Sequence, residues 1–271
     1  MREVKMRSGF MCPICRKPLE QKEKSLVCES RHCFDIAKSG YVNLLASQGG
    51  IHGDDKTMVR ARHEFLKKGY YAPLKAAMAD AVRGKSGTLL DAGCGDCYYT
   101  QGMRAAAPDM QVLAVDISKD ALHVAKEHSQ GIERAVASTA KLPLEDGSVD
   151  VATVMFAPVF ADELARVLRD GGELLIAAPC ERHLFELKEI LYENPYENDA
   201  EEFADDRFVR TDTVYIKSEV TIDSCEDIKA LFLMTPYFYR TSPEAAKRLD
   251  SLERLKVTTE FKIMKYEKKR L

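Results

Sequence analysis

The sequence predicts an α/β fold with a doubly wound, mostly parallel sheet, preceded by a small metal-binding module at the N-terminus. Short apolar runs alternate with helical patterns between residues 88 and 178, and this alternation is typical of βαβ units in a parallel sheet. Cysteines near the N-terminus have the spacing of a metal site. Residues 257–266 alternate between apolar and polar side chains and are expected to form a final, antiparallel strand.

The central feature is an apolar strand that begins at Thr88 and runs into a tight turn containing Gly93 and Gly95. Glycine at such a turn permits positive φ and lets a ligand lie against bare backbone. The helical pattern that follows places a helix N-terminus, with its free N–H groups, beside that ligand. The dinucleotide fingerprint G-x-G-x-x-G/A requires a small third residue, but Tyr98 stands there. The turn therefore predicts a nucleotide-like cofactor of another kind.

An acidic residue, Asp91, lies two positions before the first glycine. This arrangement resembles the D-x-G-x-G loop of S-adenosylmethionine-dependent methyltransferases. The usual third glycine of that loop is Cys97 here. Cys94 and Cys97 form a C-x2-C pair with no matching second pair, so we interpret them as loop residues and not as metal ligands.

A second predicted strand ends in Asp116, which lies 21 residues after Gly95. An acid at that offset is placed to accept both ribose hydroxyls of an adenosine. The alternative is that Asp116 is the N-cap of the following helix, although Ser118 could equally take that position. Together with the glycine loop, the ribose interpretation is favoured.

The N-terminal region contains the pattern C-x2-C-x12-C-x3-H, formed by Cys12, Cys15, Cys28 and His32. Four such ligands at this spacing are typical of a closed, tetrahedral zinc site, so we expect a structural ion and not a catalytic one. Cys33 is also within reach, but we prefer His32 as the fourth ligand. The alternative is a set of unrelated buried thiols. A module of this size cannot form a sufficient core, so zinc must contribute folding free energy.

Charge is distributed unevenly although the net charge is only −3. Residues 1–72 carry 14 basic and 8 acidic side chains, a net of +6, whereas residues 193–227 carry a net of −9. A basic N-terminal module is compatible with binding a polyanion. We expect a soluble, cytoplasmic protein with no membrane partner, because the chain has no run of 18 apolar residues and no signal-like N-terminus. In that compartment, eight cysteines favour metal binding or buried thiols over disulfides.

The chain is expected to divide into a zinc-binding module (1–46), a glycine-containing linker (47–57) and a large α/β domain (58–271). The expected helices are 58–68, 72–82, 98–107, 118–128, 161–168, 179–192, 224–234 and 243–255, and the expected strands after the first are 111–116, 135–137, 151–156, 173–178, 214–222 and 257–266.

Taken together, these motifs resemble the large-subunit ribosomal RNA (guanine-N1)-methyltransferases over nearly the whole chain. The most specific segments are Cys-Pro-Ile-Cys at 12–15, Gly-Tyr-Val-Asn-Leu-Leu at 40–45 and the loop at 91–100. Further matching segments are 34–39, 69–74, 142–143, 163–168 and 182–184. The resemblance implies a Rossmann-like class I methyltransferase that transfers a methyl group from S-adenosylmethionine to N1 of a guanine in a 23S rRNA hairpin.

The resemblance also implies that Tyr71, Gly95, Asp96 and His183 contact the cofactor. The expected cofactor-binding set is therefore Tyr71, Asp91, Gly93, Gly95, Asp96, Asp116 and His183. Members of the family tend to form dimers, their zinc module is thought to help grip the RNA, and one branch is linked to macrolide resistance. No catalytic residue is assigned, because Ala157 and Pro158 after the fourth strand offer only backbone carbonyls and an apolar wall.

Two other classes of protein remain as alternatives. A small-molecule methyltransferase would share residues 88–178 but would not need the zinc module. A non-catalytic, zinc-containing RNA-binding protein would keep the basic module but would not need Asp91, the glycine loop and Asp116 together.

Overall fold

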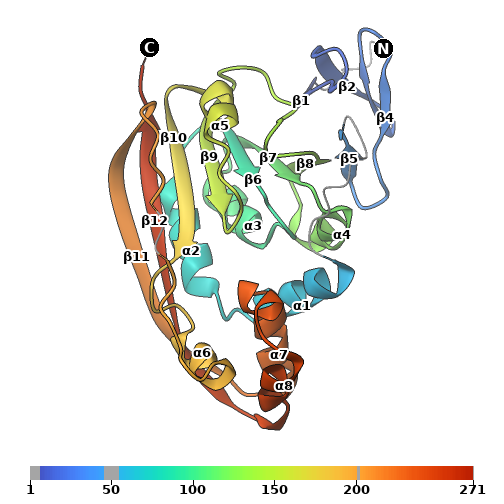
Figure 1. Cartoon of the computed structure of the whole chain (residues 1–271). Helices are drawn as coiled ribbons and strands as arrows, with labels where there is room; N and C mark the ends of the chain where they lie inside the picture. The colour runs from blue at the N-terminus through green and yellow to red at the C-terminus, as the bar shows by residue number, and fades with distance from the viewer. Residues whose placement is uncertain (1–6, 46–54, 200–201, 271) are drawn as a thin grey trace.

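The structure, a computed structural model, describes residues 7–45, 55–199 and 202–270, and within them the strands form two sheets (Figure 1). The smaller sheet has four antiparallel strands in the order β1-β2-β3-β4 and belongs to the N-terminal module. Its strands are β1 (Arg7–Met11), β2 (Pro18–Lys22), β3 (Ser25–Cys28) and β4 (Cys33–Asp35).

The larger sheet has eight strands in the order β11-β12-β10-β9-β6-β7-β8-β5. The β5-to-β10 part is parallel, whereas β12 is antiparallel to both of its neighbours. The strands are β5 (Tyr41–Asn43), β6 (Gly87–Ala92), β7 (Met110–Asp116), β8 (Ile132–Val136), β9 (Val149–Met155), β10 (Leu168–Pro179), β11 (Phe208–Ile222) and β12 (Leu255–Lys268). The doubly wound, mostly parallel sheet with an antiparallel C-terminal strand is therefore confirmed.

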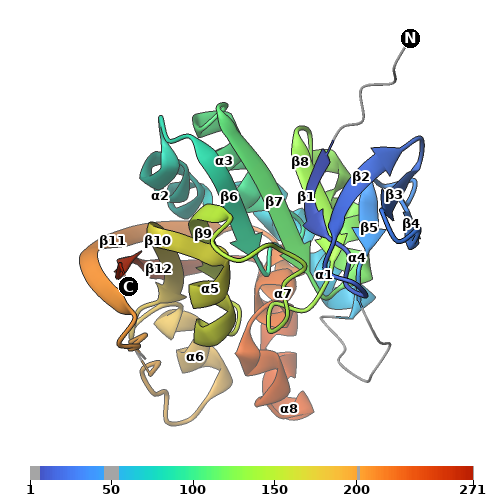
Figure 2. The same cartoon turned by 90° about the horizontal axis from the view of Figure 1, so that it is seen from above.

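Helices cover both faces of this sheet, as buried apolar residues show. Side chains such as Leu89 and Val112 face one core with α1, α2, α3 and α7, whereas Leu90 and Leu113 face a second core with α5 and the N-terminal module. Figure 2 shows β1 and β2 beside β7 and β8, on that second side. The helices are α1 (Lys56–Lys67), α2 (Ala72–Val82), α3 (Tyr98–Ala106), α4 (Lys119–Val124), α5 (Ala161–Val167), α6 (Phe185–Leu191), α7 (Cys225–Leu233) and α8 (Pro243–Ala246), with 3-10 turns at Ala125–His128, Pro236–Tyr239 and Lys247–Ser251.

The strand order fixes where a ligand binds. From β6 the chain adds β7 and β8 on one side, then returns to add β9 and β10 on the other. In open α/β sheets, ligands bind outside the carboxyl ends of the strands where the winding direction reverses. Here that point lies between β6 and β9, where the glycine loop and the Phe156–Phe160 connection begin.

The N-terminal module is attached to the large domain by strand pairing and by hydrogen bonds, including those from Arg16 to the carbonyls of Leu142 and Leu144. Strand β5 pairs with β8 in parallel, with Val42 opposite Ala135, and so extends the large sheet at its edge. In addition, the backbone N–H of Met11 donates to the carbonyl of Pro143 at 2.7 Å. The expected linker 47–57 lies outside the described residues except for its last three, of which Asp55 caps α1 by accepting from the backbone N–H groups of Thr57 and Met58.

Two expected helices were wrong in part. The expected helix 179–192 begins only at Phe185, because β10 continues to Pro179 and Leu184 adopts a left-handed φ of 55° that interrupts the helix. Arg182 and His183 therefore lie in a turn. The expected helix 243–255 ends at Ala246 and continues as a 3-10 turn to Ser251, and its last residue already belongs to β12. No helix of the described segments is both long and apolar enough to span a bilayer.

Candidate cofactor and metal sites

The turn after β6 requires its glycines. Gly93 has φ of 86°, and a Cβ added there would lie 2.7 Å from the Cβ of Ala157, so any larger residue would collide with the β9–α5 connection. Gly95 also has a positive φ, of 54°. Cys97 adopts φ of 61°, a conformation that non-glycine residues rarely use. The loop thus keeps a glycine-type backbone at Cys97, where the usual third glycine is missing.

Asp116 lies at the end of β7 and reaches this loop. Its carboxylate accepts the backbone N–H of Gly95 and that of Ser118, each at 2.8 Å. The hydroxyl of Ser118 caps α4 by accepting from the N–H of Ala121 at 3.2 Å, so Asp116 is not the N-cap. This geometry favours the ribose interpretation.

Asp91 lies behind the loop. It is fully buried, and its carboxylate accepts from the hydroxyls of Thr100 and Thr153 at 2.5 and 2.9 Å. Burial raises the pKa of Asp91 to about 6, against the lowering effect of these two hydrogen bonds. The carboxylate therefore ties β6 to α3 and β9, and we propose that it holds the loop in place from behind.

Asp96 joins the loop to two other elements. Its carboxylate accepts from Nδ1 of His63 on α1 at 2.7 Å and from the backbone N–H of Tyr98 at 3.1 Å. Nδ1 of His128 donates to the backbone carbonyl of Asp96 at 3.2 Å. All three side chains are buried, and the hydrogen bond to Asp96 raises the pKa of His63. His63 and His128 belong to no motif in the sequence, because they meet Asp96 only through tertiary packing.

Tyr71 and His183 are brought together although 112 residues separate them. Nε2 of His183 lies 3.5 Å from the Tyr71 hydroxyl, and Nδ1 accepts from the backbone N–H of Glu260 at 3.1 Å. Burial lowers the pKa of His183 to about 3, so the ring is neutral and carries its proton on Nε2. Both rings pack against buried Phe261, with centroid separations of 5.0 and 4.4 Å.

The predicted zinc ligands form one cluster. The ligand atoms of Cys12, Cys15, Cys28 and His32 lie within 4.8 Å of one another. Nδ1 of His32 is 3.4 Å from the sulfurs of Cys12 and Cys28, and the sulfurs of Cys15 and Cys28 are 3.6 Å apart. A zinc tetrahedron has edges of about 3.5 Å between nitrogen and sulfur and about 3.8 Å between sulfurs. These residues therefore fit zinc.

Two further observations agree with this fit. A hydrogen bond from the backbone N–H of Lys17 lowers the pKa of Cys15 to about 6, which favours the thiolate that binds metal, whereas burial raises the pKa of Cys12. Cys33 is exposed and is absent from the cluster. The geometry thus agrees with His32 as the fourth ligand.

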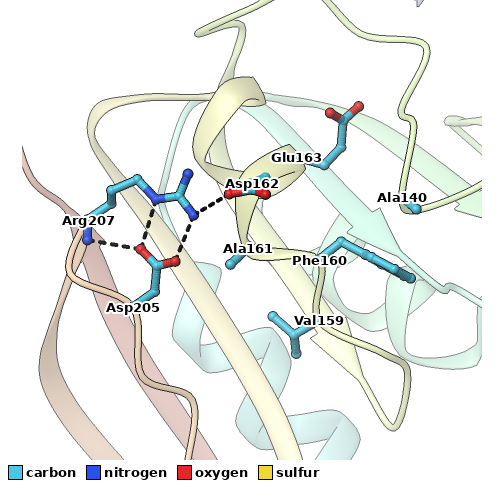
Figure 3. Close-up of a pocket in the computed structure, with 8 residues that line it drawn as sticks. All are labelled: Ala140, Val159, Phe160, Ala161, Asp162, Glu163, Asp205 and Arg207. Atoms are coloured by element: carbon cyan, nitrogen blue, oxygen red, sulfur yellow. Dashed lines mark hydrogen bonds and ion pairs between the residues drawn. The ribbon is translucent and has the colours of Figure 1, made fainter.

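A pocket of about 350 Å³ lies beside the β9–α5 connection (Figure 3). None of the predicted cofactor residues lines it. The guanidinium of Arg207 donates to Asp205 and Asp162, so the one cation among the lining residues is already paired. The lining residues are Ala140, Val159, Phe160, Ala161, Asp162, Glu163, Asp205 and Arg207. This acidic lining is unsuited to a phosphate, and we assign the pocket no role.

Comparison with known protein families matches both parts of the chain. Residues 10–49 match the family model described as "RlmA, N-terminal", a zinc ribbon, and residues 90–176 match that of a methyltransferase domain. A protein of Streptomyces fradiae named 23S rRNA (guanine(748)-N(1))-methyltransferase is 37% identical over 186 residues, covering 66% of both chains.

Two relatives have provisional names as 23S rRNA (guanine-N(1)-)-methyltransferases. The one from Micromonospora griseorubida is 38% identical over 202 residues, covering 66% of this chain and 68% of the relative. The one from Bacillus subtilis, YxjB, is 28% identical over 278 residues, covering 95% of this chain and 96% of the relative. The present chain thus spans about two thirds of the Streptomyces and Micromonospora proteins and nearly all of the Bacillus protein.

The sheet order and the glycine loop define a class I methyltransferase that uses S-adenosylmethionine as its methyl donor. Its N-terminal zinc ribbon holds one structural zinc ion. The chain belongs to the family of 23S rRNA (guanine-N1)-methyltransferases. The small-molecule methyltransferase and the non-catalytic RNA-binding protein are therefore disfavoured.

Proposed function

We propose that this protein transfers a methyl group from S-adenosylmethionine to N1 of one specific guanine in a hairpin of 23S rRNA. The observation that carries the proposal is the union of a zinc ribbon with a methyltransferase sheet, joined by β5 and by the Met11–Pro143 hydrogen bond. The names of the relatives supply the substrate class.

Methyl transfer demands little covalent chemistry from the protein. The sulfonium of S-adenosylmethionine supplies an activated methyl group, so the chain mainly has to align an in-line displacement. Guanine N1 carries a proton that must leave. His183 is a poor acceptor, since its Nδ1 already accepts a backbone N–H. We therefore assign no general base among the described residues.

The cofactor-binding residues form part of the proposal. Gly93 and Gly95 present backbone to the cofactor, and Asp116 accepts from the ribose. Asp91 and Asp96 fix the loop, while Tyr71 and His183 bound the site on the β12 side. The support comes from the convergence of the two glycines and the three aspartates on the carboxyl ends of β6 and β7, and from the buried pairs already described.

Replacing Asp116 tests the ribose contact. We expect Asp116→Ala to weaken binding of S-adenosylhomocysteine by about 10- to 100-fold in calorimetry, because a charge-assisted hydrogen bond contributes roughly 1.5–3 kcal/mol. Asp109→Ala, an exposed acid just before the same strand, is the matched control. Equal affinities for the two variants would remove Asp116 from the site.

Mass spectrometry of 23S rRNA tests the proposed reaction. We expect rRNA from cells lacking this protein to lose one N1-methylguanine, and the purified enzyme to restore it with S-adenosylmethionine. Loss of a different methylated nucleotide, or of none, would contradict the proposal.

We further propose that the zinc module binds the RNA while the α/β domain carries out methyl transfer. Residues 1–72 have a net charge of +6 and residues 73–192 a net of −6. Lys24 and Arg31 are exposed on the module. Reversing the charge of both residues to Glu should weaken rRNA binding without changing cofactor affinity. The slope of log affinity against log salt concentration should become shallower by about one for each phosphate contact that is lost. Arg83→Glu, on an exposed helix end, is the control.

The remaining proposals concern context. The family resemblance supports a homodimer, which sedimentation of the purified protein would detect. It also supports action in the cytoplasm and a contribution to macrolide resistance, which growth of the deletion strain on macrolides would reveal. A monomer in sedimentation, or unchanged resistance, would reject the corresponding proposal.

A further inference from the structure

Phe156, the first residue after β9, has a backbone conformation that its side chain disfavours. Its φ is 55°, in the left-handed region that glycine and asparagine occupy readily but bulky residues rarely do. Its backbone N–H donates to the carbonyl of Ala177 on β10 at 3.3 Å. Strained backbone of this kind persists where the surrounding structure enforces it, and it clusters at active sites.

The strain does not bury the ring, because 49% of Phe156 is exposed. A single exposed phenylalanine is unremarkable by itself. Here, however, a glycine-compatible position holds a large ring that faces solvent. Backbone preference does not account for a phenylalanine at this position, whereas a ligand contact on the exposed half of the ring does.

The position of Phe156 is next to the cofactor loop. The adjacent Ala157 approaches Gly93 so closely that a Cβ at Gly93 would lie only 2.7 Å from its own. Phe156 also follows β9 at the carboxyl edge of the sheet, beside the point where the winding reverses. A group resting on the ring is therefore close to the cofactor site.

Other aromatic rings support Phe156 from within the protein. Its centroid is 5.6 Å from buried Phe261 and 6.3 Å from buried Tyr99, with tilted rings in both cases. Phe261 in turn packs against Tyr71 and His183. The ring of Phe156 is thus the solvent-exposed end of a buried aromatic row.

We propose that Phe156 is the platform on which the target guanine stacks while its N1 faces the methyl donor. The inference rests on the proposed function, since it concerns the base that is methylated. Enzymes that modify a base must take it out of the stack, and RNA-binding proteins hold unstacked bases on aromatic rings. The three residues that follow Phe156 (Ala157, Pro158 and Val159) carry no charge.

Kinetics of Phe156 variants test the platform. We expect Phe156→Ala to lower kcat/KM for the rRNA by about 10- to 100-fold, the range that stacking interactions give on alanine substitution. Phe156→Tyr should recover most of the activity. Binding of S-adenosylhomocysteine and the melting temperature should stay close to wild type in both. Phe160→Ala, which removes a 40% exposed ring from the same connection, is the control and should keep full activity.

A spectroscopic readout separates stacking from a structural role. The chain contains no tryptophan, so Phe156→Trp introduces a single indole. In the presence of S-adenosylhomocysteine, a 23S rRNA transcript should quench the emission of that indole, since a stacked guanine is close to it. The same transcript should leave the indole of Phe160→Trp nearly unchanged.

Failure of the inference is distinguishable from failure of the proposed function. One outcome would overturn the platform alone. In it, the wild-type enzyme forms N1-methylguanine, the Phe156→Trp variant is not quenched and the Phe156→Ala variant is fully active. A second outcome would support the platform and overturn the proposed reaction. In it, the Phe156→Trp variant is quenched and the Phe156→Ala variant loses activity, but the wild-type enzyme forms a methylated nucleotide other than N1-methylguanine.

Discussion

The zinc-ribbon cluster and the cluster of His63, Asp96 and His128 both contain side chains that can bind metal, yet the distances between their ligand-type atoms differ. In both, the ligand-type atoms lie within 4.8 Å of one another. In the ribbon, Nδ1 of His32 is 3.4 Å from the sulfurs of Cys12 and Cys28, and the sulfurs of Cys15 and Cys28 are 3.6 Å apart, spacings that suit a zinc ion. At Asp96, Nδ1 of His63 is only 2.7 Å from the carboxylate, the length of a charge-assisted hydrogen bond.

This difference shows what each region needs. The ribbon is a small sheet, and an ion is required to stabilise it. The Asp96 cluster instead joins α1, the cofactor loop and the 3-10 turn at Ala125–His128 inside a large core. There, a hydrogen bond between His63 and Asp96 is sufficient to hold these elements together. Ligand-type side chains in proximity therefore do not by themselves make a metal site. The distances between their atoms decide.

The largest effect is expected from losing a ribbon ligand. Cys28→Ser should release the zinc and unfold the ribbon, because structural zinc sites contribute apparent binding free energies on the order of 10–16 kcal/mol. Metal analysis of the wild type should find about one zinc per chain. Cys33→Ser is the matched control, since Cys33 is exposed and outside the cluster. Zinc loss from Cys33→Ser but not from His32→Ala would reverse the choice of fourth ligand.

A smaller effect is expected at Asp96. His63→Ala should lower the free energy of unfolding by about 3–5 kcal/mol, because it leaves a buried carboxylate without its partner. The raised pKa of His63 means that the stabilisation is full below pH 6.5 and is lost as pH rises through that pKa. Urea unfolding at several pH values measures both. Glu127→Gln, at an exposed acid 3.6 Å from the same imidazole, should cost under about 1 kcal/mol. A second tightly bound zinc lost with His63→Ala would erase the contrast between the two clusters.

The smallest effect is expected at Asp91, whose carboxylate is held by two hydroxyl groups and not by a cationic side chain or a metal ion. Its pKa rises from about 3.8 unfolded to about 6 folded, so the folded state keeps a proton that the unfolded state has lost. Stability should therefore fall by at most roughly 3 kcal/mol as pH rises from 4 to 6. Asp91→Asn should flatten that part of the pH profile in denaturant unfolding. An unchanged profile would mean that Asp91 does not titrate there.

The features that the sequence predicts best are local. The zinc ligands span 21 residues, and the loop from Asp91 to Cys97 has a backbone set by its own glycines. The βα alternation likewise depends on short-range periodicity, and it predicted the doubly wound, mostly parallel sheet.

The features that the sequence could not predict depend on distant partners. Strand β5 has three residues and exists because β8 offers a free edge. His63 and Asp96 are 33 residues apart and meet only in the folded core. The helix expected from Pro179 starts late because β10 continues along β12 to that residue, so sheet pairing overrides a local helical pattern.

The pairing of β5 with β8 also sets an order of assembly during synthesis. All four zinc ligands leave the ribosome before the first strand of the large sheet, so the nascent ribbon can take up its ion and fold early. Strand β5 then waits until β8 has emerged, because Val42 has its partner at Ala135. Long-range pairing of this kind forms late. We therefore expect the methyltransferase sheet to close onto a module that has already folded.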